Sequence, residues 1–187
     1  MKNLFLCTGL LMAATAVYAQ PAPMHAPSGP PKSPAATETA NLAGKAISIT
    51  YSSPRVNGRA GHIFSKDGLI SKDPNYPIWR AGANAATKLH TDADLTIGEL
   101  NVPKGDYTLY INLADPDNWE LIINKQIGQW GLTHDAAQDL GVVKMTMAKP
   151  AAPIENLKYA ITDLGGGAGK LTLEWENYSA SVPLAAH

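Results

Sequence analysis

The feature of this sequence that most constrains its fold is a repeated two-residue alternation. From Ile47 to Ser52, apolar residues alternate with small hydroxyl-bearing residues, and the same pattern returns in many later segments. Successive side chains of a β-strand point to opposite faces, so the pattern predicts short strands with one buried face. The expected strands cover residues 47–52, 95–97, 100–102, 107–113, 119–124, 142–147, 157–162, 171–176 and 178–184.

Turn-forming residues separate these segments. The run Pro103–Asp106 predicts a hairpin between residues 100–102 and 107–113, because proline presets φ and glycine accepts the left-handed conformation. A glycine-rich loop at 165–169 joins two later strands, and only a short helix at 133–140 and one helical turn at 84–89 are expected. About eight or nine antiparallel strands indicate an all-β fold, either a β-sandwich or a jelly roll.

The first 19 residues have the pattern of a secretory signal peptide. Lys2 is followed by an apolar run from Leu4 to Ala14 and by the small-x-Ala cleavage pattern at 17–19. We therefore expect export to the periplasm or the extracellular space. The run is shorter than the ~20 residues of a transmembrane helix, so no transmembrane segment is predicted. The one cysteine, Cys7, lies in this peptide, and its removal leaves no thiol for a disulfide, a metal or catalysis.

Residues 20–44 contain six prolines with many alanines and serines and almost no large apolar side chain. Such a composition predicts a disordered linker, which leaves residues 45–187 as a single β-sandwich domain. Without Lys2, 14 basic residues face 16 acidic ones, with no run of one sign. Neither nucleic acid nor an anionic membrane is therefore an expected partner.

One polar cluster stands out as a candidate site. The stretch from 79 to 87 holds a tryptophan, an arginine, a glycine and an asparagine without apolar periodicity, and two further arginines lie four residues apart upstream. Guanidinium groups bind carboxylates bidentately, so three converging arginines would form a pocket for a small anionic or saccharide ligand. The predicted ligand-binding residues are Arg55, Arg59, Arg80, Asn84 and Trp79.

Several spaced motifs give this chain a resemblance to a known family. They are Tyr-Ser-x-Pro-x-Val-x-Gly-Arg at 51–59, Trp-Arg-x-Gly-Ala-Asn-x-Ala-Thr at 79–87, Pro-x-Gly-x-Tyr-x-Leu at 103–109, Trp119 with Asn124, and Trp130 with Gly131. In these it resembles the exported bacterial family called domain of unknown function 2911. The resemblance implies a secreted or periplasmic β-rich domain and supplies no activity. Members often carry an acidic residue after the asparagine of the second motif, where this chain has Ala85.

No chemistry-bearing motif accompanies the cluster. The central histidines, His62, His90 and His134, lack metal-ligand spacing, so neither a metal nor another cofactor is predicted. A Gly-x-Ser-x-Gly nucleophile motif is absent. A glycosidase would use two carboxylates, and many pairs can be drawn from Asp106, Asp115, Asp117, Glu120, Glu174 and Glu176, but the sequence singles out none.

The tryptophans divide into two groups. Trp119 and Trp175 lie in strand patterns and are expected in the core, whereas Trp79 and Trp130 lie in loops and are candidates for an exposed stacking platform. The leading hypothesis is a non-enzymatic binding domain for a small polar or saccharide ligand, or for a protein partner. One alternative is a hydrolase of cell-envelope or extracellular carbohydrate. The other is a purely structural role in which Trp79 seals the core and Arg80 ties loop carbonyls.

Overall fold

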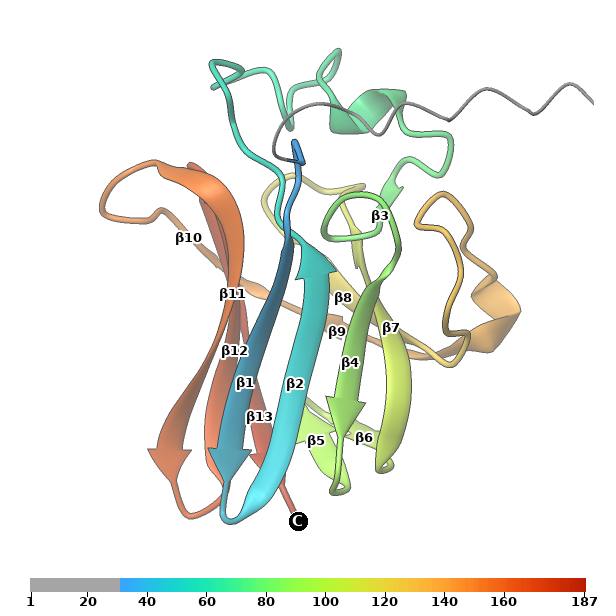
Figure 1. The fold of residues 1–187 in the computed structure, drawn as a ribbon, viewed down its shortest axis with the longest axis vertical. Helices are drawn as coiled ribbons and strands as arrows, with labels where there is room; N and C mark the ends of the chain where they lie inside the picture. Colours follow the sequence, from blue (N-terminus) through green and yellow to red (C-terminus); the bar gives the residue numbers. More distant parts are fainter. Residues whose placement is uncertain (1–30) are drawn as a thin grey trace, which may run out of the picture.

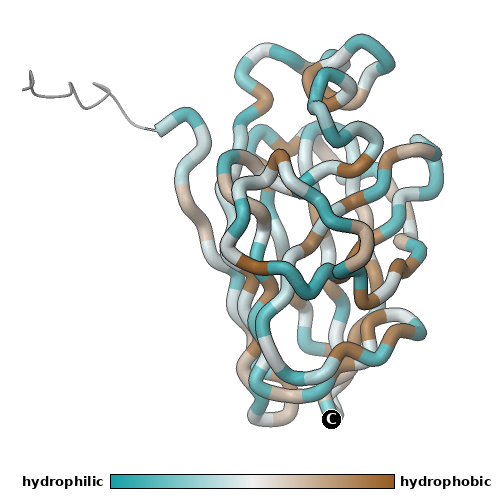
Figure 2. Tube along the Cα trace, turned by 90° about the vertical axis from the view of Figure 1, so that its right-hand side faces the viewer, coloured by the Kyte–Doolittle hydropathy of each residue, from teal (hydrophilic) through white to brown (hydrophobic). Residues whose placement is uncertain are grey.

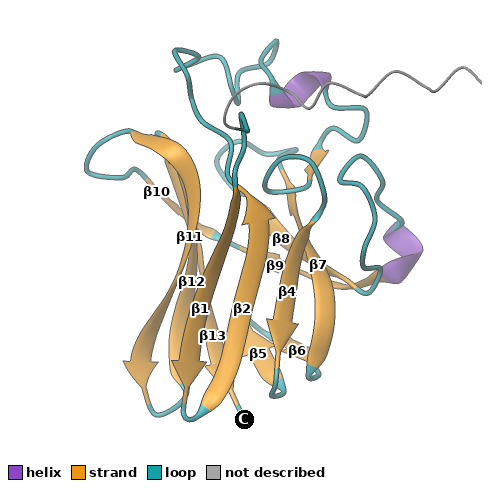
Figure 3. Ribbon diagram, viewed as in Figure 1, coloured by secondary structure: helices purple, strands orange, loops and turns teal. Residues whose placement is uncertain are grey.

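The computed structural model describes residues 31–187, and the expected signal peptide lies outside this range. The described chain forms two antiparallel sheets that face each other as a β-sandwich (Figures 1 and 3). The predicted all-β sandwich is thus confirmed. No helix among residues 31–187 is long and apolar enough to cross a membrane.

The first sheet has seven strands in the order β1-β2-β4-β7-β8-β9, with β3 paired to β7. Its strands are β1 (Ala35–Leu42), β2 (Lys45–Ser52), β3 (Ile78–Trp79), β4 (Thr87–Thr91), β7 (Gly105–Asn112), β8 (Glu120–Asn124) and β9 (Asp139–Lys144). The second sheet has six strands in the order β11-β12-β13-β5-β6, with β10 paired to β13. Its strands are β5 (Leu95–Ile97), β6 (Leu100–Val102), β10 (Thr146–Ala148), β11 (Ile154–Gly165), β12 (Ala168–Glu176) and β13 (Tyr178–Ala186).

Strand β1 corrects the predicted linker. The segment 20–44 was expected to be disordered, yet Ala35–Leu42 pairs along its whole length with β2, through a turn at Ala43 and Gly44 with φ of 50° and 82°. The backbone hydrogen bonds to β2 hold this strand in the sheet, because it has too few apolar side chains to be held by burial alone. Its Glu38 side chain also accepts a hydrogen bond from the backbone N–H of Ile161 at 3.0 Å, which joins the edges of the two sheets.

The expected hairpin at Pro103–Asp106 is wrong. Strand β6 pairs with β5 in one sheet and β7 pairs with β4 and β8 in the other, so this turn carries the chain between the sheets. Gly98, with φ of 59°, instead closes a hairpin between β5 and β6. A local turn signal bends the chain but does not choose the strand's partner. The helical turn expected at 84–89 is also wrong, because β4 begins at Thr87.

Thirteen strands form within residues 31–187, where about eight or nine were expected. The additional strands, β1, β3, β4 and β10, lack the strong alternation of the others or are very short, and neighbouring strands hold them in place. Two short 3₁₀ helices interrupt the loops, η1 (Ile70–Lys72) and η2 (Ala136–Gln138). The second lies where a short helix was expected at 133–140, but it is a single three-residue turn, and β9 begins at Asp139.

The apolar faces of both sheets form one continuous core, and hydrophobic and hydrophilic residues alternate along the chain in Figure 2. The core ends in an aromatic cluster in which Phe64 contacts Trp79, Trp119, Trp175 and Tyr178 at ring-centroid distances of 4.8–5.7 Å. Trp119 and Trp175 are buried as predicted. Phe64 belongs to the long connection between β2 and β3, which covers this end of the sandwich at the top of Figure 1.

Candidate functional site

The connection between β2 and β3 begins as an extended segment that is fixed to β11. The backbone N–H of Val56 donates to Glu155 at 2.8 Å, and that of Leu157 donates to the carbonyl of Pro54 at 2.9 Å. The chain then turns at Asn57 and Gly58, whose φ values of 49° and 73° are left-handed. Asparagine and glycine adopt this conformation more readily than other residues do. The turn brings Arg55 and Arg59 to the covered end of the sandwich.

The stretch from 79 to 87 is held in place by hydrogen bonds that its backbone carbonyl groups accept. The carbonyl of Ala81 accepts hydrogen bonds from the Tyr159 hydroxyl at 2.9 Å and from Thr87 at 3.2 Å, and that of Gly82 accepts from the Trp79 indole at 3.2 Å. Burial raises the pKa of Tyr159, which keeps this hydroxyl a donor. The stretch is therefore a rigid loop that presents its remaining polar groups outward.

Trp79 does not form the exposed platform that its loop position suggested. Its side chain is only 1% exposed and stacks on Trp175 at 5.9 Å. The loop itself turns with positive φ at Ala81 and Asn84, 50° and 60°, whereas the intervening Gly82 does not have a positive φ. Trp79 thus seals the core beneath the site, as the structural alternative proposed for this residue.

A cavity of about 860 Å³ lies at this end of the molecule, and all five predicted site residues line it. Trp79 belongs to its floor, since little of that ring is exposed. Five basic and one acidic side chain give the lining a formal net charge of +4: Lys32, Arg55, Arg59, Lys72, Arg80 and Asp73. We call this space the cationic cavity. Lys32, Lys72 and Asp73 were not predicted, because they lie outside the two polar stretches at 51–59 and 79–87 and form no motif.

Arg80 is held in a fixed position in the cavity wall. Its Nη2 donates to Asp73 Oδ2 at 2.7 Å, its Nη1 donates to the carbonyl of Asn84 at 3.3 Å, and the two charged side chains are only 16% and 6% exposed. Gly131 makes room for it, because a Cβ there would lie 2.2 Å from Arg80 Cδ and 2.7 Å from the oxygen of Asn84. The glycine of the Trp130-Gly131 pair is therefore required by packing.

The other two arginines differ from each other. Arg59 donates to the carbonyls of Val56 at 3.0 Å and Arg55 at 2.6 Å, so it stabilises the turn that it follows. The Arg55 side chain is exposed, and it makes no hydrogen bond or ion pair with another residue between 31 and 187. Asn84 donates weakly to Ser52 at 3.3 Å and is exposed. Arg55 is consequently the guanidinium group most available to a ligand.

Trp130 stands at the edge of the cavity with 58% of its surface exposed, as its loop position suggested. Its loop is paired with the 79–87 stretch, since Ala86 donates to Gln129 and Gly131 donates to Asn84 through their backbones at 3.3 and 3.1 Å. Exposed tryptophans of this kind offer a flat apolar face beside polar groups. The structure thus places an aromatic surface next to a cluster of cationic side chains.

Buried polar groups support the Trp130 loop from below. Asn124 donates to the Asp135 carbonyl at 2.9 Å and to the Asp139 carboxylate at 2.7 Å, and His134 lies 3.0 Å from the same carboxylate. Gln129 donates to the Tyr110 hydroxyl at 2.9 Å. His134 therefore has a structural partner, and no cluster of three or more histidine, cysteine or acidic side chains suited to a metal occurs within residues 31–187.

Two donors in the cavity wall lack acceptors among the described residues. They are Arg80 Nε and the indole nitrogen of Trp175, and both atoms are buried. An unsatisfied buried donor costs about 1–3 kcal/mol relative to a paired one. Both atoms lie beneath the surface of the wall, and it is the net positive lining that favours a guest with negative charge.

The motifs that build this cavity are also those of a family. A family model described as Protein of unknown function (DUF2911) matches residues 33–184. The chain belongs to this family. The match begins at residue 33 and so includes β1, which agrees with the structure in placing that strand inside the DUF2911 domain. No curated protein and no solved structure matched the chain. Membership in DUF2911 identifies no substrate or reaction.

Proposed function

We propose that this DUF2911 protein is an exported binding domain whose cationic cavity holds a small anionic ligand, with an acidic saccharide as the best-fitting class. The observation that carries the proposal is the convergence of Arg55, Arg59 and Arg80 on one cavity of about 860 Å³ with a net positive lining. Such a volume is in the range of small-molecule sites, ~300–1,000 Å³. Export rests on the pattern of residues 1–19.

The three arginines have different roles in the proposed binding site. Arg59 and Arg80 are engaged by carbonyls and by Asp73, so they shape the wall and set its potential. Arg55 has no partner among the described residues, and neither does the ammonium group of Lys72, so both can pair directly with a carboxylate. Arginine binds carboxylates bidentately, which provides orientation as well as attraction.

The neutral part of the ligand is suggested by Trp130 and the two amides that line the cavity. A sugar ring can stack on the exposed face of Trp130, while Asn57 and Asn84 can bond its hydroxyl groups. A ligand with both a carboxylate and hydroxyl groups would use every part of this lining. That combination favours an acidic saccharide over a simple inorganic anion.

The other two hypotheses gain less support from the geometry. Asp73 is the only carboxylate that lines the cavity within residues 31–187, and it is paired with Arg80. A glycosidase needs two carboxylates across the bond that it cleaves. A purely structural role explains Trp79 and Arg59, which bond to their own loops, but it gives no use to Arg55, Lys72 or the exposed Trp130.

Calorimetric titration with glucuronate, and with neutral glucose as the comparison, tests the proposal. We expect saturable binding of glucuronate that is weakened by salt, because part of the attraction is screened. The Arg55→Ala variant should lose about tenfold in affinity, which corresponds to ~1.4 kcal/mol, while its melting temperature stays unchanged. Lys170→Ala, which removes an exposed charge from β12, is the matched control.

Two results would reject this assignment. One is the absence of saturable binding by glucuronate and by oligomers of uronic acids. The other is binding that Arg55→Ala and Lys170→Ala weaken to the same extent, since that would reflect net charge and not this cavity. Equal affinity for glucose would retain a sugar site but remove the anionic part of the proposal.

A further inference from the structure

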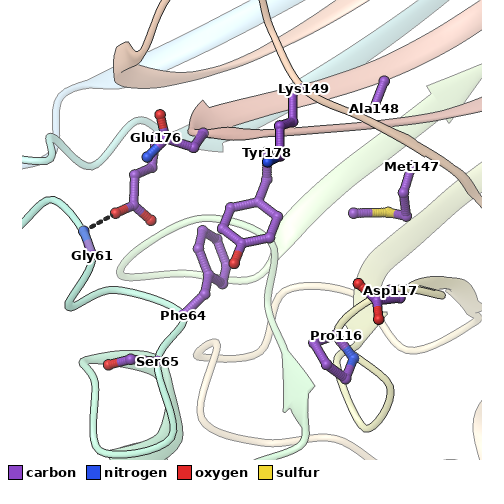
Figure 4. Close-up of a pocket in the computed structure, with 11 residues that line it drawn as sticks. Gly61, Phe64, Ser65, Pro116, Asp117, Met147, Ala148, Lys149, Glu176 and Tyr178 are labelled. Carbon is purple, nitrogen blue, oxygen red and sulfur yellow. Dashed lines mark hydrogen bonds between the residues drawn. The ribbon is translucent and has the colours of Figure 1, made fainter.

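A second cavity, of about 590 Å³, lies at the same end of the sandwich and shares no lining residue with the cationic cavity. Figure 4 shows Glu176, Phe64 and Tyr178 around it, with Asp117 and Met147 on the far side. Two acidic residues, Glu176 and Asp117, and one basic residue, Lys149, give its lining a formal net charge of −1. We call it the acidic cavity.

Glu176 is the unusual group of this cavity. Its side chain lies in a tight turn between β12 and β13, where Trp175 pairs with Tyr178, and the residue is only 2% exposed. Its φ of 55° is left-handed, a conformation in which glycine or asparagine is the usual choice. One carboxylate oxygen accepts a hydrogen bond from the backbone N–H of Gly61, and the other lies toward Phe64 in Figure 4.

This buried carboxylate has no cationic partner within residues 31–187. No lysine, arginine or histidine forms an ion pair with Glu176, and Lys149, on the same cavity, is not within 4.0 Å of it. A buried charge is strongly unfavourable unless it is paired. The carboxylate has one hydrogen bond from Gly61 and no counter-ion among the described residues, so a cation that enters the cavity can supply the missing partner.

The aromatic walls also favour a cation. The Phe64 and Tyr178 rings lie 4.8 Å apart at 62°, and Tyr178 is supported from behind by Trp119, stacked at 5.2 Å and 18°. The faces of aromatic rings carry negative electrostatic potential and attract ammonium groups. Met147 and Pro116 extend the apolar lining, which suits the methyl or methylene groups attached to such a nitrogen.

We infer that the acidic cavity binds an organic ammonium cation, with Glu176 as its counter-ion and Phe64 and Tyr178 as its aromatic walls. This site is separate from the proposed anion site in its residues and opposite to it in charge. Glu176 also anchors the loop at Gly61, so a test must separate charge from anchoring. Glutamine does so, because its side-chain carbonyl can still accept from Gly61 but it carries no charge.

The experiment is a calorimetric titration of the purified protein with choline, with ethanolamine, and with dimethylbutanol, the neutral carbon isostere of choline. Choline or ethanolamine should bind saturably and dimethylbutanol should not, and the stronger of the two cations indicates a methylated or a primary ammonium ligand. Glu176→Gln should lose about tenfold or more in cation affinity and remain folded. Tyr178→Leu, which keeps apolar volume but removes a ring, should weaken choline binding severalfold.

A variant of opposite sign completes the test. Lys149→Gln removes the one basic side chain that lines the cavity among residues 31–187, and it should strengthen cation binding. The inference is overturned if neither cation binds, if dimethylbutanol binds as tightly as choline, or if Glu176→Gln binds choline like the wild type. If Glu176→Gln does not fold, Tyr178→Leu and Lys149→Gln test the inference in its place. Choline affinity that is unchanged in both of these variants overturns the inference.

Discussion

The two cavities at the covered end of the sandwich differ in charge, although both are built against the same aromatic cluster. The cationic cavity has a net charge of +4 and an exposed tryptophan at its edge, whereas the acidic cavity has a net charge of −1 and a buried carboxylate. Trp175 lines the first and its neighbour Glu176 lines the second. At the end of β12, two consecutive residues therefore line cavities of opposite charge.

This difference shows how a rigid aromatic cluster can serve two polar surfaces. Trp79, Trp175 and Phe64 pack together, and Trp79 belongs to one cavity while Phe64 belongs to the other. Opposite charges on one protein can coexist when each cluster is held by its own partners. Arg80 is held by Asp73, and Glu176 by the backbone of Gly61.

The largest expected effect comes from removing the shared support. Trp79→Ala would take away a ring that is almost fully buried and that contacts Phe64 and Trp175. Large-to-small core substitutions of this kind cost about 3–5 kcal/mol in the free energy of unfolding. Guanidinium denaturation should show this loss, and binding at both cavities should fail together. If one cavity kept its affinity, the two would not depend on a common support.

Asp73→Asn should separate the cavities with the next largest effect. The change breaks the ion pair with Arg80, where both side chains are largely buried, and should cost about 2 kcal/mol in the free energy of unfolding. It also raises the net charge of the cationic cavity, so glucuronate should bind severalfold more tightly by calorimetry. Choline binding should not change, and Asp67→Asn, an exposed residue outside both linings, is the control.

Gly131→Ala should disturb only the cationic cavity. The added methyl group would collide with Arg80 and with the backbone oxygen of Asn84, so one of them must move. Such overpacking costs about 1–2 kcal/mol, measurable by thermal unfolding. Glucuronate affinity should fall while choline affinity is retained. Gly128→Ala in the same loop is the control, because it adds the same methyl group into open space, although the φ of 78° adds backbone strain there.

The smallest effect concerns a histidine that lines neither cavity. Asp106 and then Asp92 accept hydrogen bonds from His90 and raise its pKa, so pairing contributes stability below the ordinary pKa of about 6.5. That contribution is lost as the pH rises through the raised pKa. Because the His90 side chain is 44% exposed, we expect only a few tenths of a kcal/mol, about the range of surface ion pairs.

Urea denaturation of the wild type and of His90→Gln between about pH 5 and pH 9 measures this contribution. The stability difference between the two proteins should shrink as the pH rises. A difference that is constant with pH would show that the ion pairs of His90 contribute nothing. Ligand affinities at both cavities should be the same in His90→Gln as in the wild type.

Strands with a strong alternating pattern were predictable, and those held by their neighbours were not. The segment 47–52 lies within β2 and 171–176 within β12, because burial of one strand face requires that alternation. Strand β1 has no such pattern and forms because β2 offers a complete hydrogen-bonding edge. The residues Pro103–Asp106 do form a turn, as predicted, but the strands on its two sides, β6 and β7, belong to different sheets.

The candidate site was predictable in part for a similar reason. A cluster of arginine, asparagine and tryptophan without periodicity marked the 79–87 stretch, and its polar members do line one cavity with Arg55 and Arg59. The sequence could not show that Trp79 points into the core, since a loop tryptophan can face either way. Nor did it single out Glu176, which has the spacing of an ordinary strand residue.

By itself, the sequence determined the all-β class, the family and the residues available for an anion site. Those properties follow from local patterns, in which each residue is interpreted through its near neighbours. Only the tertiary structure decided that Glu176 would be buried without a cationic partner, that Asp73 would hold Arg80, and that two cavities of opposite charge would form at one end. These depend on contacts between residues far apart in the chain, where sheet pairing and packing, and not local preference, set which groups meet.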